Sequence, residues 1–407
     1  MRDFTMLVQD RFLKYVSFDT QSDENSASVP STEKQKLLGA YLADELSRIG
    51  LSDAHMDEYG YVYAFLPATE GYEDRDTIGF IAHMDTSPDV SGKDVKPAIV
   101  HYEGGDIPLG NGTVITREKD FPFLAKYVGQ DVIVTDGTTL LGADDKAGVS
   151  EILTACEHLV AHPEIPHGRI AVGITPDEEI GTGADHFDIA KFGAKWAYTV
   201  DGGEIPEIEY ENFNAASAHV TVHGVNIHPG TAKNKMKNAV LMLCDFVARM
   251  PAAETPAHTE NYEGFYHISS IDGDESLAKL GMIIRDHDRE KFENRKEFVQ
   301  NLVAYMNSVY GEGTFELDLR DSYYNMKEMI LPHMHIIRAA EDAMRRVGLD
   351  PVCVPIRGGT DGARLSFMGL PCPNLATGGM NFHGIHECIP VRSMEKMVEV
   401  LVELMRA

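Results

Sequence analysis

Apolar residues recur along the first half of the chain with two alternating periods, one helical and one extended. Helical spacing covers residues 3–18 and 32–50, and the second stretch ends at Gly50, a residue typical of helix ends. A further helical stretch covers Lys146–Val160. Short apolar or β-branched runs predict buried strands over Val62–Leu66, Thr77–Ala82, Ile170–Thr175 and Trp196–Val200. Strands that alternate with helices predict an α/β fold with a mostly parallel sheet covered by helices.

This pattern changes near Asn212. Within residues 212–321, the pattern predicts a strand at Ala218–Val225, a helix at Asn238–Arg249 and two strands within Phe265–Ile284. A second helix at Asp288–Tyr310 and a last strand at Thr314–Arg320 follow. This order and this size are typical of a ferredoxin-like α+β domain. The α/β pattern then resumes with Pro332–Val347, Val352–Ile356 and Ser393–Arg406. We therefore expect one domain of residues 1–211 and 322–407, interrupted by an inserted domain of residues 212–321.

Charge and composition restrict the partners of the chain. Its 407 residues include 36 Lys and Arg but 64 Asp and Glu, a net charge of −28 that argues against binding to nucleic acid or to anionic membranes. The five cysteines show no CxxC spacing, which suits reduced thiols. No uninterrupted apolar stretch approaches the roughly 20 residues that span a bilayer, and charges interrupt the N-terminal segment. We expect a soluble cytoplasmic protein.

Polar residues gather after several of the predicted strands, where open α/β sheets place their ligands. They are His83 with Asp85, the adjacent acids Asp144 and Asp145 before a helix, the adjacent acids Glu178 and Glu179, Asp201, and the late loop with His383 and His386. A turn or a helix cap explains any one of these clusters by itself. Two adjacent acids after a buried strand are costly, however, unless cations neutralise them.

Together these clusters favour a metal site. Oxygen-rich sites with one imidazole per ion suit a pair of zinc, cobalt or manganese ions better than structural zinc. Two such ions activate a water molecule, and an acid that binds neither ion must then accept the proton of that water. Chemistry alone does not decide whether Asp144 or Asp145 is the ligand.

Five motifs in a fixed order identify a family resemblance. They are His83-Met-Asp85, Gly142-Ala-Asp-Asp-Lys-Ala-Gly148, Pro176-Asp-Glu-Glu-Ile-Gly181, Asp201-Gly-Gly203 and Asn381-Phe-His-Gly-Ile-His-Glu387. The ordered set resembles the M20 family of di-zinc peptidases, and within it the tripeptide aminopeptidases. The likeness covers nearly the whole chain and includes Glu211-Asn-Phe-Asn-Ala215 and His228-Pro-Gly-Thr-Ala-Lys233.

The resemblance implies two Zn²⁺ per subunit, with Co²⁺ or Mn²⁺ as substitutes, and a role for each acid. Asp145 is expected to bridge both ions, with His83 and Asp201 on one ion and Glu179 and His383 on the other. Asp85 is expected to steady His83, and Glu178 to act as the general base. His383 is preferred to His386 because the family places a glutamate four residues after its ligand histidine, and that position is Glu387.

The inserted domain resembles the M20 lid, which implies a homodimer formed through this domain. His228 matches the histidine that stabilises the oxyanion, often in the site of the neighbouring subunit. Either Arg285 or Arg357 is expected to hold the substrate carboxylate, since a guanidinium binds a carboxylate through two hydrogen bonds. Asn381 is a further candidate for substrate binding. A metal site at one end of the peptide and an arginine at the other would then measure peptide length.

The favoured function is release of the N-terminal residue from short peptides, with tripeptides as the expected substrates. One alternative keeps the metals and changes the substrate, because M20 relatives also include dipeptidases, carboxypeptidases and deacylases. A second alternative is a binding protein that has kept the fold without catalysis. Retention of Glu178 argues against that alternative, because a binding protein has little use for an acid that binds no metal.

Overall fold

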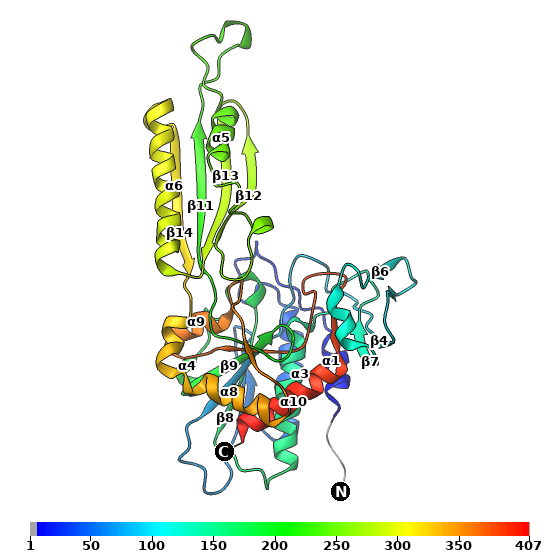
Figure 1. The fold of residues 1–407 in the computed structure, drawn as a ribbon. Helices are drawn as coiled ribbons and strands as arrows, with labels where there is room; N and C mark the ends of the chain where they lie inside the picture. Colours follow the sequence, from blue (N-terminus) through cyan, green and yellow to red (C-terminus); the bar gives the residue numbers. More distant parts are fainter. Residues whose placement is uncertain (1–5, 407) are drawn as a thin grey trace. The chain divides into compact units, whose positions relative to one another are not determined.

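The computed structural model describes residues 6–406, and within it the chain forms two compact units (Figure 1). The first unit contains the residues up to Tyr210, Glu328–Val354 and the residues from Thr360 onward. The second unit contains Glu211–Lys327 and the short segment Pro355–Gly359. The expected inserted range of 212–321 lies inside the second unit, whereas the sequence pattern assigned residues 355–359 to the other domain.

An eight-stranded sheet forms the centre of the first unit, with the strand order β1-β2-β8-β3-β9-β16-β10-β15. Its strands are β1 (Ser52–Met56), β2 (Val62–Leu66), β3 (Ile78–His83), β8 (Ile170–Thr175), β9 (Trp196–Gly202), β10 (Glu207–Glu209), β15 (Val352–Cys353) and β16 (Asn374–Ala376). The central strands β8, β3, β9 and β16 run parallel, while β1, β2 and β10 pair antiparallel to their inner neighbours. The predicted α/β fold is therefore present, with parallel pairing confined to the centre and to the β10–β15 edge pair.

Helices cover this sheet and supply much of the core. They are α1 (Val8–Tyr15), α2 (Gln35–Ile49), α3 (Ala143–Ala161), α4 (Ile189–Phe192), α7 (Lys327–Ile330), α8 (His335–Arg346), α9 (Asp361–Phe367) and α10 (Val391–Met405). Helix α3 is buried on nearly all sides because it lies between the sheet and helices α1 and α10. An aromatic cluster that includes Tyr63, Phe187 and Phe192 joins the sheet to α4 and α9. Residues 3–5 of the first expected helix lie outside the described residues.

Two small sheets lie in a region to which the sequence pattern assigned no elements. One contains β4 (Ala98–Tyr102), β7 (Gln130–Val134) and β17 (Cys388–Pro390), and the other contains β5 (Ile107–Leu109) and β6 (Val114–Thr116). The short 3-10 helices η1 (Pro122–Tyr127) and η5 (Leu331–His333) complete the first unit outside the site. The pairing of β17 with β7 brings the late loop at 381–387 to this part of the unit.

The second unit is a four-stranded antiparallel sheet with two helices. Its elements are β11 (Asn214–His223), η3 (Pro229–Thr231), α5 (Ala239–Ala248), η4 (Pro256–His258), β12 (Phe265–Gly273), β13 (Leu277–Asp286), α6 (Arg289–Tyr310) and β14 (Phe315–Tyr323). The strand order β12-β13-β11-β14 places the first and third strands in the middle, as in ferredoxin-like domains. Alternate residues of β11, such as Ala218 and Val220, face the helices and form the core with Phe246 and Phe292. The predicted β-α-β-β-α-β order is confirmed.

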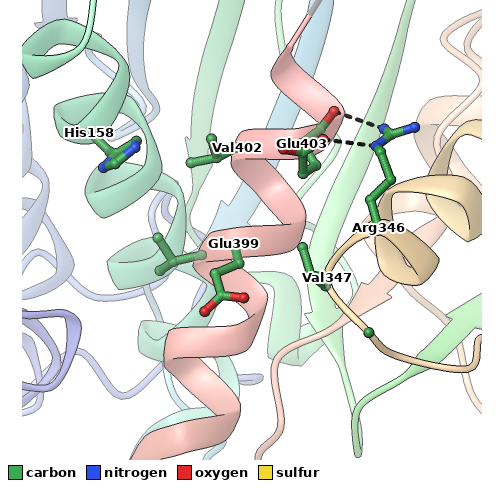
Figure 2. A pocket seen from close by; sticks show the side chains of 8 residues that line it. His158, Arg346, Val347, Glu399, Val402 and Glu403 are labelled. Atoms are coloured by element: carbon green, nitrogen blue, oxygen red, sulfur yellow. Dashed lines mark hydrogen bonds and ion pairs between the residues drawn. The ribbon is translucent and has the colours of Figure 1, made fainter. Parts of the chain in front are cut away.

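A pocket of about 600 Å³ lies in the first unit where α10 meets α3 and α8 (Figure 2). His158, Val347 and Val402 line it, and the Nε atom of Arg346 lies 2.8 Å from Oε2 of Glu403. None of the candidate site residues lines this pocket. Among residues 6–406, no helix combines the length and the apolar character needed to cross a membrane.

Candidate metal centre

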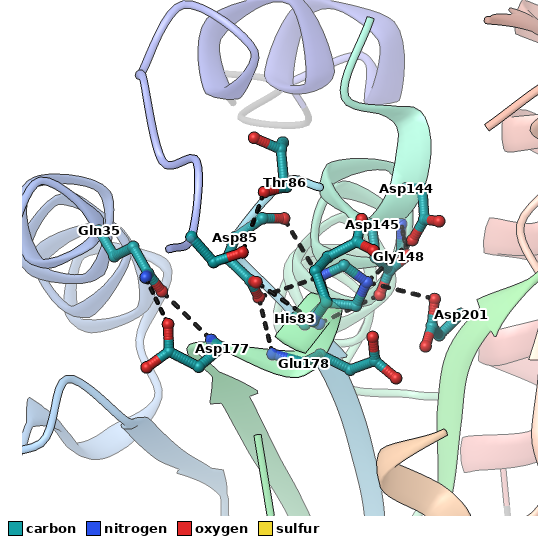
Figure 3. Close-up of polar contacts among 12 residues, drawn as sticks. Gln35, His83, Asp85, Thr86, Asp144, Asp145, Gly148, Asp177, Glu178 and Asp201 are labelled. Carbon is teal, nitrogen blue, oxygen red and sulfur yellow. Dashed lines mark hydrogen bonds and ion pairs between the residues drawn. The ribbon is translucent and has the colours of Figure 1, made fainter. Parts of the chain in front are cut away.

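The candidate ligands converge because they stand at the ends of neighbouring strands. His83 is the last residue of β3, and Asp201 lies near the end of β9, which is parallel to β3. Glu178 and Glu179 follow β8 in a one-turn 3-10 helix, η2 (Glu178–Ile180). Asp144 comes from the start of α3. Parallel strands bring their carboxyl ends to one edge of a sheet, and Figure 3 shows several of these side chains around the His83 ring.

Two groups of three side chains can each hold a metal ion, and they share Asp144. In the first group, Nε2 of His83 lies 2.8 Å from Oδ1 of Asp144 and 3.5 Å from Oδ1 of Asp201. In the second group, Nε2 of His383 lies 2.8 Å from Oε2 of Glu179 and 3.3 Å from Oδ2 of Asp144. Asp144 therefore directs one carboxylate oxygen toward each histidine. If two ions were bound, one at each group, this carboxylate would contact both of them.

The structure places Asp145, the expected bridging residue, outside both groups of candidate ligands. Its Oδ2 accepts a hydrogen bond from the backbone N–H of His83 at 3.1 Å, and its Oδ1 accepts one from the N–H of Gly148 at 3.1 Å. Asp145 is fully buried, and it belongs to neither group of candidate ligands. Backbone donors occupy both of its oxygens, and Asp144 is the side chain that the two candidate groups share. The expectation for Asp145 followed the Asp-Lys pattern of the family resemblance, whereas chemistry alone did not distinguish two adjacent acids.

Asp85 supports the site in two ways. Its Oδ1 lies 3.3 Å from Nδ1 of His83, so it orients the ring whose other nitrogen faces the acids. Its two oxygens also accept hydrogen bonds from the backbone N–H groups of Glu178, at 3.0 Å, and Glu179, at 3.2 Å. Sequence reasoning gave Asp85 only the first role. The second fixes the turn that carries the two adjacent glutamates.

Glu178 differs from Glu179 in its contacts. Within residues 6–406, the Glu178 carboxylate accepts no hydrogen bond, whereas Oε2 of Glu179 lies 2.8 Å from Nε2 of His383. Burial, followed by the negative charge of Asp201, raises the pKa of Glu178 well above its usual value. Glu178 is thus an acid beside the two groups that belongs to neither of them.

The chemistry of the donor set fits divalent cations. Burial raises the pKa of Glu179 to about 8 and that of Asp201 to about 6, so the protein alone stabilises their charged forms poorly. Hydrogen bonds to Asp144 and Glu179 raise the pKa of His383 to about 11. The Oε1 atom of Glu179 is buried and has no hydrogen-bond partner in the described part of the chain. Cations bound to these oxygens and imidazoles would stabilise the charged carboxylates and would give the buried Oε1 of Glu179 a partner.

The late loop separates its two histidines. His386 turns away from the acids, since its Nδ1 lies 2.9 Å from Oγ1 of Thr116 and its ring lies 5.1 Å from that of Phe121. His383 has a positive φ of 60°, which is uncommon for residues other than glycine and helps to direct its ring toward Glu179. Asn381, expected to bind substrate, donates from Nδ2 to the carbonyl oxygen of His386 at 3.1 Å and so also holds the loop.

Sequence reasoning missed the residue that anchors the turn before η2. Asp177 has a φ of 57°, and its carboxylate accepts hydrogen bonds from the backbone N–H of Ser31 at 2.6 Å and from its hydroxyl at 2.5 Å. Nε2 of Gln35, on α2, donates to the same carboxylate at 2.6 Å. The signal was an acid directly after Pro176, at the end of a buried strand. These bonds hold the turn from which Glu178 projects.

The candidate residues of the second unit have different environments. Arg357 is occupied, since its guanidinium donates to the carbonyl oxygens of Asn261, Glu263 and Thr259. Arg285 donates from Nη1 to the carbonyl oxygen of Arg357 at 3.1 Å, but its buried Nε has no partner among residues 6–406. His228 is exposed, and its Nδ1 accepts a hydrogen bond from the N–H of Gly230 at 3.2 Å.

Comparisons with known proteins match both the second unit and the whole chain. Residues 210–314 match the family model described as the peptidase dimerisation domain. Peptidase T of Caldanaerobacter subterraneus subsp. tengcongensis is 55% identical over 399 residues, which are 98% of this chain and 97% of that protein. The chain belongs to the peptidase T family. Peptidase T of Parabacteroides distasonis is 54% identical over 400 residues, 98% of each chain. The resemblance to M20 peptidases is confirmed, and the chain is a peptidase.

Solved structures share the peptidase T fold. The aminopeptidase PepT from Bacillus cereus superposes with a TM-score of 0.75 at 24% identity, covering 98% of this chain and 97% of that one. A Bacillus subtilis protein described as a dinuclear metal binding peptidase from the M20 family superposes with a TM-score of 0.65 at 12% identity, covering 98% and 96%. In this chain, the same fold carries two candidate metal-binding groups that share Asp144.

Proposed function

We propose that the chain is a metal-dependent aminopeptidase that removes the N-terminal residue from tripeptides. The observation that carries the proposal is the Asp144 carboxylate, which presents one oxygen to His83 and the other to His383. Glu178 stands beside this arrangement without belonging to it. Membership of the peptidase T family supports the peptide substrate, and the ordered set of motifs supports the choice of tripeptides.

Under this proposal, each metal position is held by three side chains of the first unit. His83, Asp144 and Asp201 form one position, and Asp144, Glu179 and His383 form the other. Oxygen and imidazole ligands suit Zn²⁺, with Co²⁺ or Mn²⁺ as substitutes. When bound, a pair of such ions lowers the pKa of a water molecule and polarises the carbonyl group of the peptide bond.

The residues of the chain handle the proton and hold the geometry. Glu178 accepts the proton of the attacking water, because its carboxylate is free of hydrogen bonds from residues 6–406. It then donates that proton to the leaving amine, so the same carboxylate serves as base and as acid. Asp85 and Asp177 keep Glu178 in place through its backbone and through the preceding turn.

A second hydrolase reaction on the same site is the main alternative. The fold is shared with proteins described as an aminoacylhistidine dipeptidase from Vibrio alginolyticus and as a dipeptidase from Saccharomyces cerevisiae. An aminopeptidase requires a free amine at the start of its substrate, whereas a deacylase or a carboxypeptidase does not. Comparing free with N-acetylated tripeptides therefore separates these reactions. Faster cleavage of the acetylated peptides would favour a deacylase or a carboxypeptidase.

Peptide length and metal dependence test the proposal directly. We expect free tripeptides to be cleaved faster than dipeptides and tetrapeptides, and we expect a chelator to abolish cleavage of all of them. Amino acid analysis of the products should show release of the first residue. Cleavage that persists after the metal has been removed would rule out the dinuclear mechanism.

We assign the substrate carboxylate to Arg285 rather than to Arg357, because backbone carbonyl groups already occupy the Arg357 guanidinium. In the same peptide panel, Arg285→Met should reduce the preference for tripeptides over tetrapeptides. An unchanged preference would show that this arginine does not measure peptide length.

His228 is proposed to stabilise the oxyanion, and the second unit to form a homodimer. Loss of one such donor typically lowers turnover by about 10²–10³-fold, which is the expected effect of His228→Ala. His223→Ala is a matched control, because His223 is an exposed histidine of the same unit that pairs with Glu316. Both variants should sediment as dimers. Turnover of His228→Ala equal to that of the control would exclude the role.

A further inference from the structure

Glu387 forms a bridge between two segments that carry candidate ligands. Its side chain is buried, with 1% of its surface exposed, and it stands four residues after His383. Its Oε2 accepts hydrogen bonds from the backbone N–H groups of Leu141, at 2.6 Å, and Gly142, at 2.8 Å. Its Oε1 accepts a third from the N–H of Asp144 at 3.1 Å. One carboxylate thus holds the whole segment that leads into α3.

The loop that carries Glu387 is itself closed. Met380 and Cys388 exchange backbone hydrogen bonds of 2.9 and 3.0 Å, so residues 381–387 form a loop with fixed ends. Cys388 begins β17 and pairs with Val134 of β7. His383 and Glu387 are therefore parts of one anchored loop. A contact made by Glu387 is transmitted to His383 through only a few residues of backbone.

The hydrogen bonds of Glu387 bear on Asp144, which stands at the start of α3. An aspartate at the start of a helix ordinarily accepts hydrogen bonds from the free N–H groups of that helix end. Here Asp145 takes that role by accepting from the N–H of Gly148, and Glu387 accepts from the N–H groups of Leu141, Gly142 and Asp144. Both oxygens of Asp144 are consequently available to the two histidines, at 2.8 Å from Nε2 of His83 and 3.3 Å from Nε2 of His383.

We propose that Glu387 is a positioning residue that sets the Asp144 and His383 segments in register for metal binding before any ion is present. The inference rests on the proposed function, because it concerns the same metal positions. It assigns Glu387 no direct contact with metal or substrate. Since Asp144 belongs to both ligand groups, loss of the bridge should weaken both metal positions together.

Zinc binding by the metal-free full-length protein tests this inference. Glu387→Gln keeps the size of the side chain but places an amide N–H₂ group against a backbone donor. We expect both zinc dissociation constants, measured by competition with a chromophoric chelator, to rise by about 10–100-fold, the usual cost of losing a group that supports metal ligands. Turnover should recover when zinc is added to saturation.

The matched control is Glu45→Gln, which changes another buried glutamate of the first unit. Glu45 accepts hydrogen bonds from Nε of Arg11 and from the hydroxyl of Tyr15, both at 2.9 Å, and it belongs to neither ligand group. If Glu387 contributed only to the stability of the fold, the zinc dissociation constants of Glu387→Gln and Glu45→Gln would change by the same factor. We expect Glu45→Gln to bind zinc as the wild-type protein does.

Three results would overturn the inference. The inference is wrong if Glu387→Gln binds zinc with the dissociation constants of the wild-type protein. It is also wrong if Glu45→Gln loses as much zinc affinity as Glu387→Gln does. Absence of zinc binding by the wild-type protein would overturn the proposed function and this inference with it. If Glu387→Gln does not fold, hydrogen exchange on the metal-free wild-type protein decides. Slow exchange at Leu141, Gly142 and Asp144 supports the bridge, and exchange as fast as in an unstructured loop refutes it.

Discussion

Glu178→Gln is expected to retain both metals and to lose turnover by about 10²–10⁴-fold, the range that general acid–base catalysis contributes. The amide cannot accept the proton of the attacking water, yet it has nearly the same size and leaves both ligand groups intact. Metal content by atomic emission and kcat on a tripeptide are the two measurements. KM should change little, because the substitution removes an interaction of the transition state.

Glu179→Gln is the comparison for this variant, because it changes the adjacent residue in the same way. Glu179 belongs to the group with Asp144 and His383, so its loss should weaken one metal position and leave the other. The two glutamates should therefore differ in metal content. Equal metal loss in the two variants, or near-normal turnover of Glu178→Gln, would contradict the separate roles assigned to them.

Asp144→Asn should release both metals, since it alters the one side chain that the two ligand groups share. The amide group presents only one oxygen, whereas the carboxylate directs Oδ1 toward His83 and Oδ2 toward His383. Affinity at both positions should fall by more than the roughly 10–100-fold that loss of a supporting group costs. Zinc stoichiometry of the purified variant, followed by isothermal titration, measures the effect. Peptidase activity should fall below detection at ordinary zinc concentrations.

Asp145→Asn provides the comparison that separates the two adjacent acids. Asp145 accepts hydrogen bonds from the N–H groups of His83 and Gly148. The change therefore disturbs the position of the candidate ligand His83 without removing any candidate ligand. We expect this variant to keep two zinc ions with weaker affinity. If Asp145→Asn lost both ions while Asp144→Asn kept them, the shared position would return to Asp145.

The parts of the fold that the sequence predicts well are those with a strong local pattern. Strands β2 (Val62–Leu66) and β8 (Ile170–Thr175) match their apolar runs residue for residue, because both are buried along their whole length. The alternating pattern of the second unit likewise predicts its six elements in order, since one face of its sheet is covered by helices. Local hydrophobic pattern is sufficient where burial is continuous.

Other parts depend on contacts between distant segments and leave no local pattern. The strands β4, β5, β6 and β7 are short and partly exposed, so their residues show neither a continuous apolar run nor a long alternation. The segment Pro355–Gly359 joins the second unit through contacts such as the Arg357 guanidinium with the carbonyl oxygen of Thr259. The spacing of apolar and polar residues along the chain does not indicate such contacts.

The candidate site shows the same division. Residue chemistry and motif order located His83, Glu179, Asp201 and His383, which the structure brings into two groups. Residue chemistry did not choose between Asp144 and Asp145, and the motif favoured Asp145, because the backbone N–H groups that occupy the Asp145 carboxylate leave no signal in the sequence. Nor did they assign roles to Asp177 or Glu387, whose partners lie more than a hundred residues away along the chain.

The insertion of the second unit places His383 far downstream of the other ligand candidates. His83, Asp144, Glu179 and Asp201 all precede Glu211, where the second unit begins, whereas His383 follows it. Under the proposed function, one metal position takes all its side chains from residues that precede the insertion, whereas the other also needs His383 from beyond it. Under this proposal, folding of the first unit must bring together the parts of the chain on both sides of the insertion before the second position is complete.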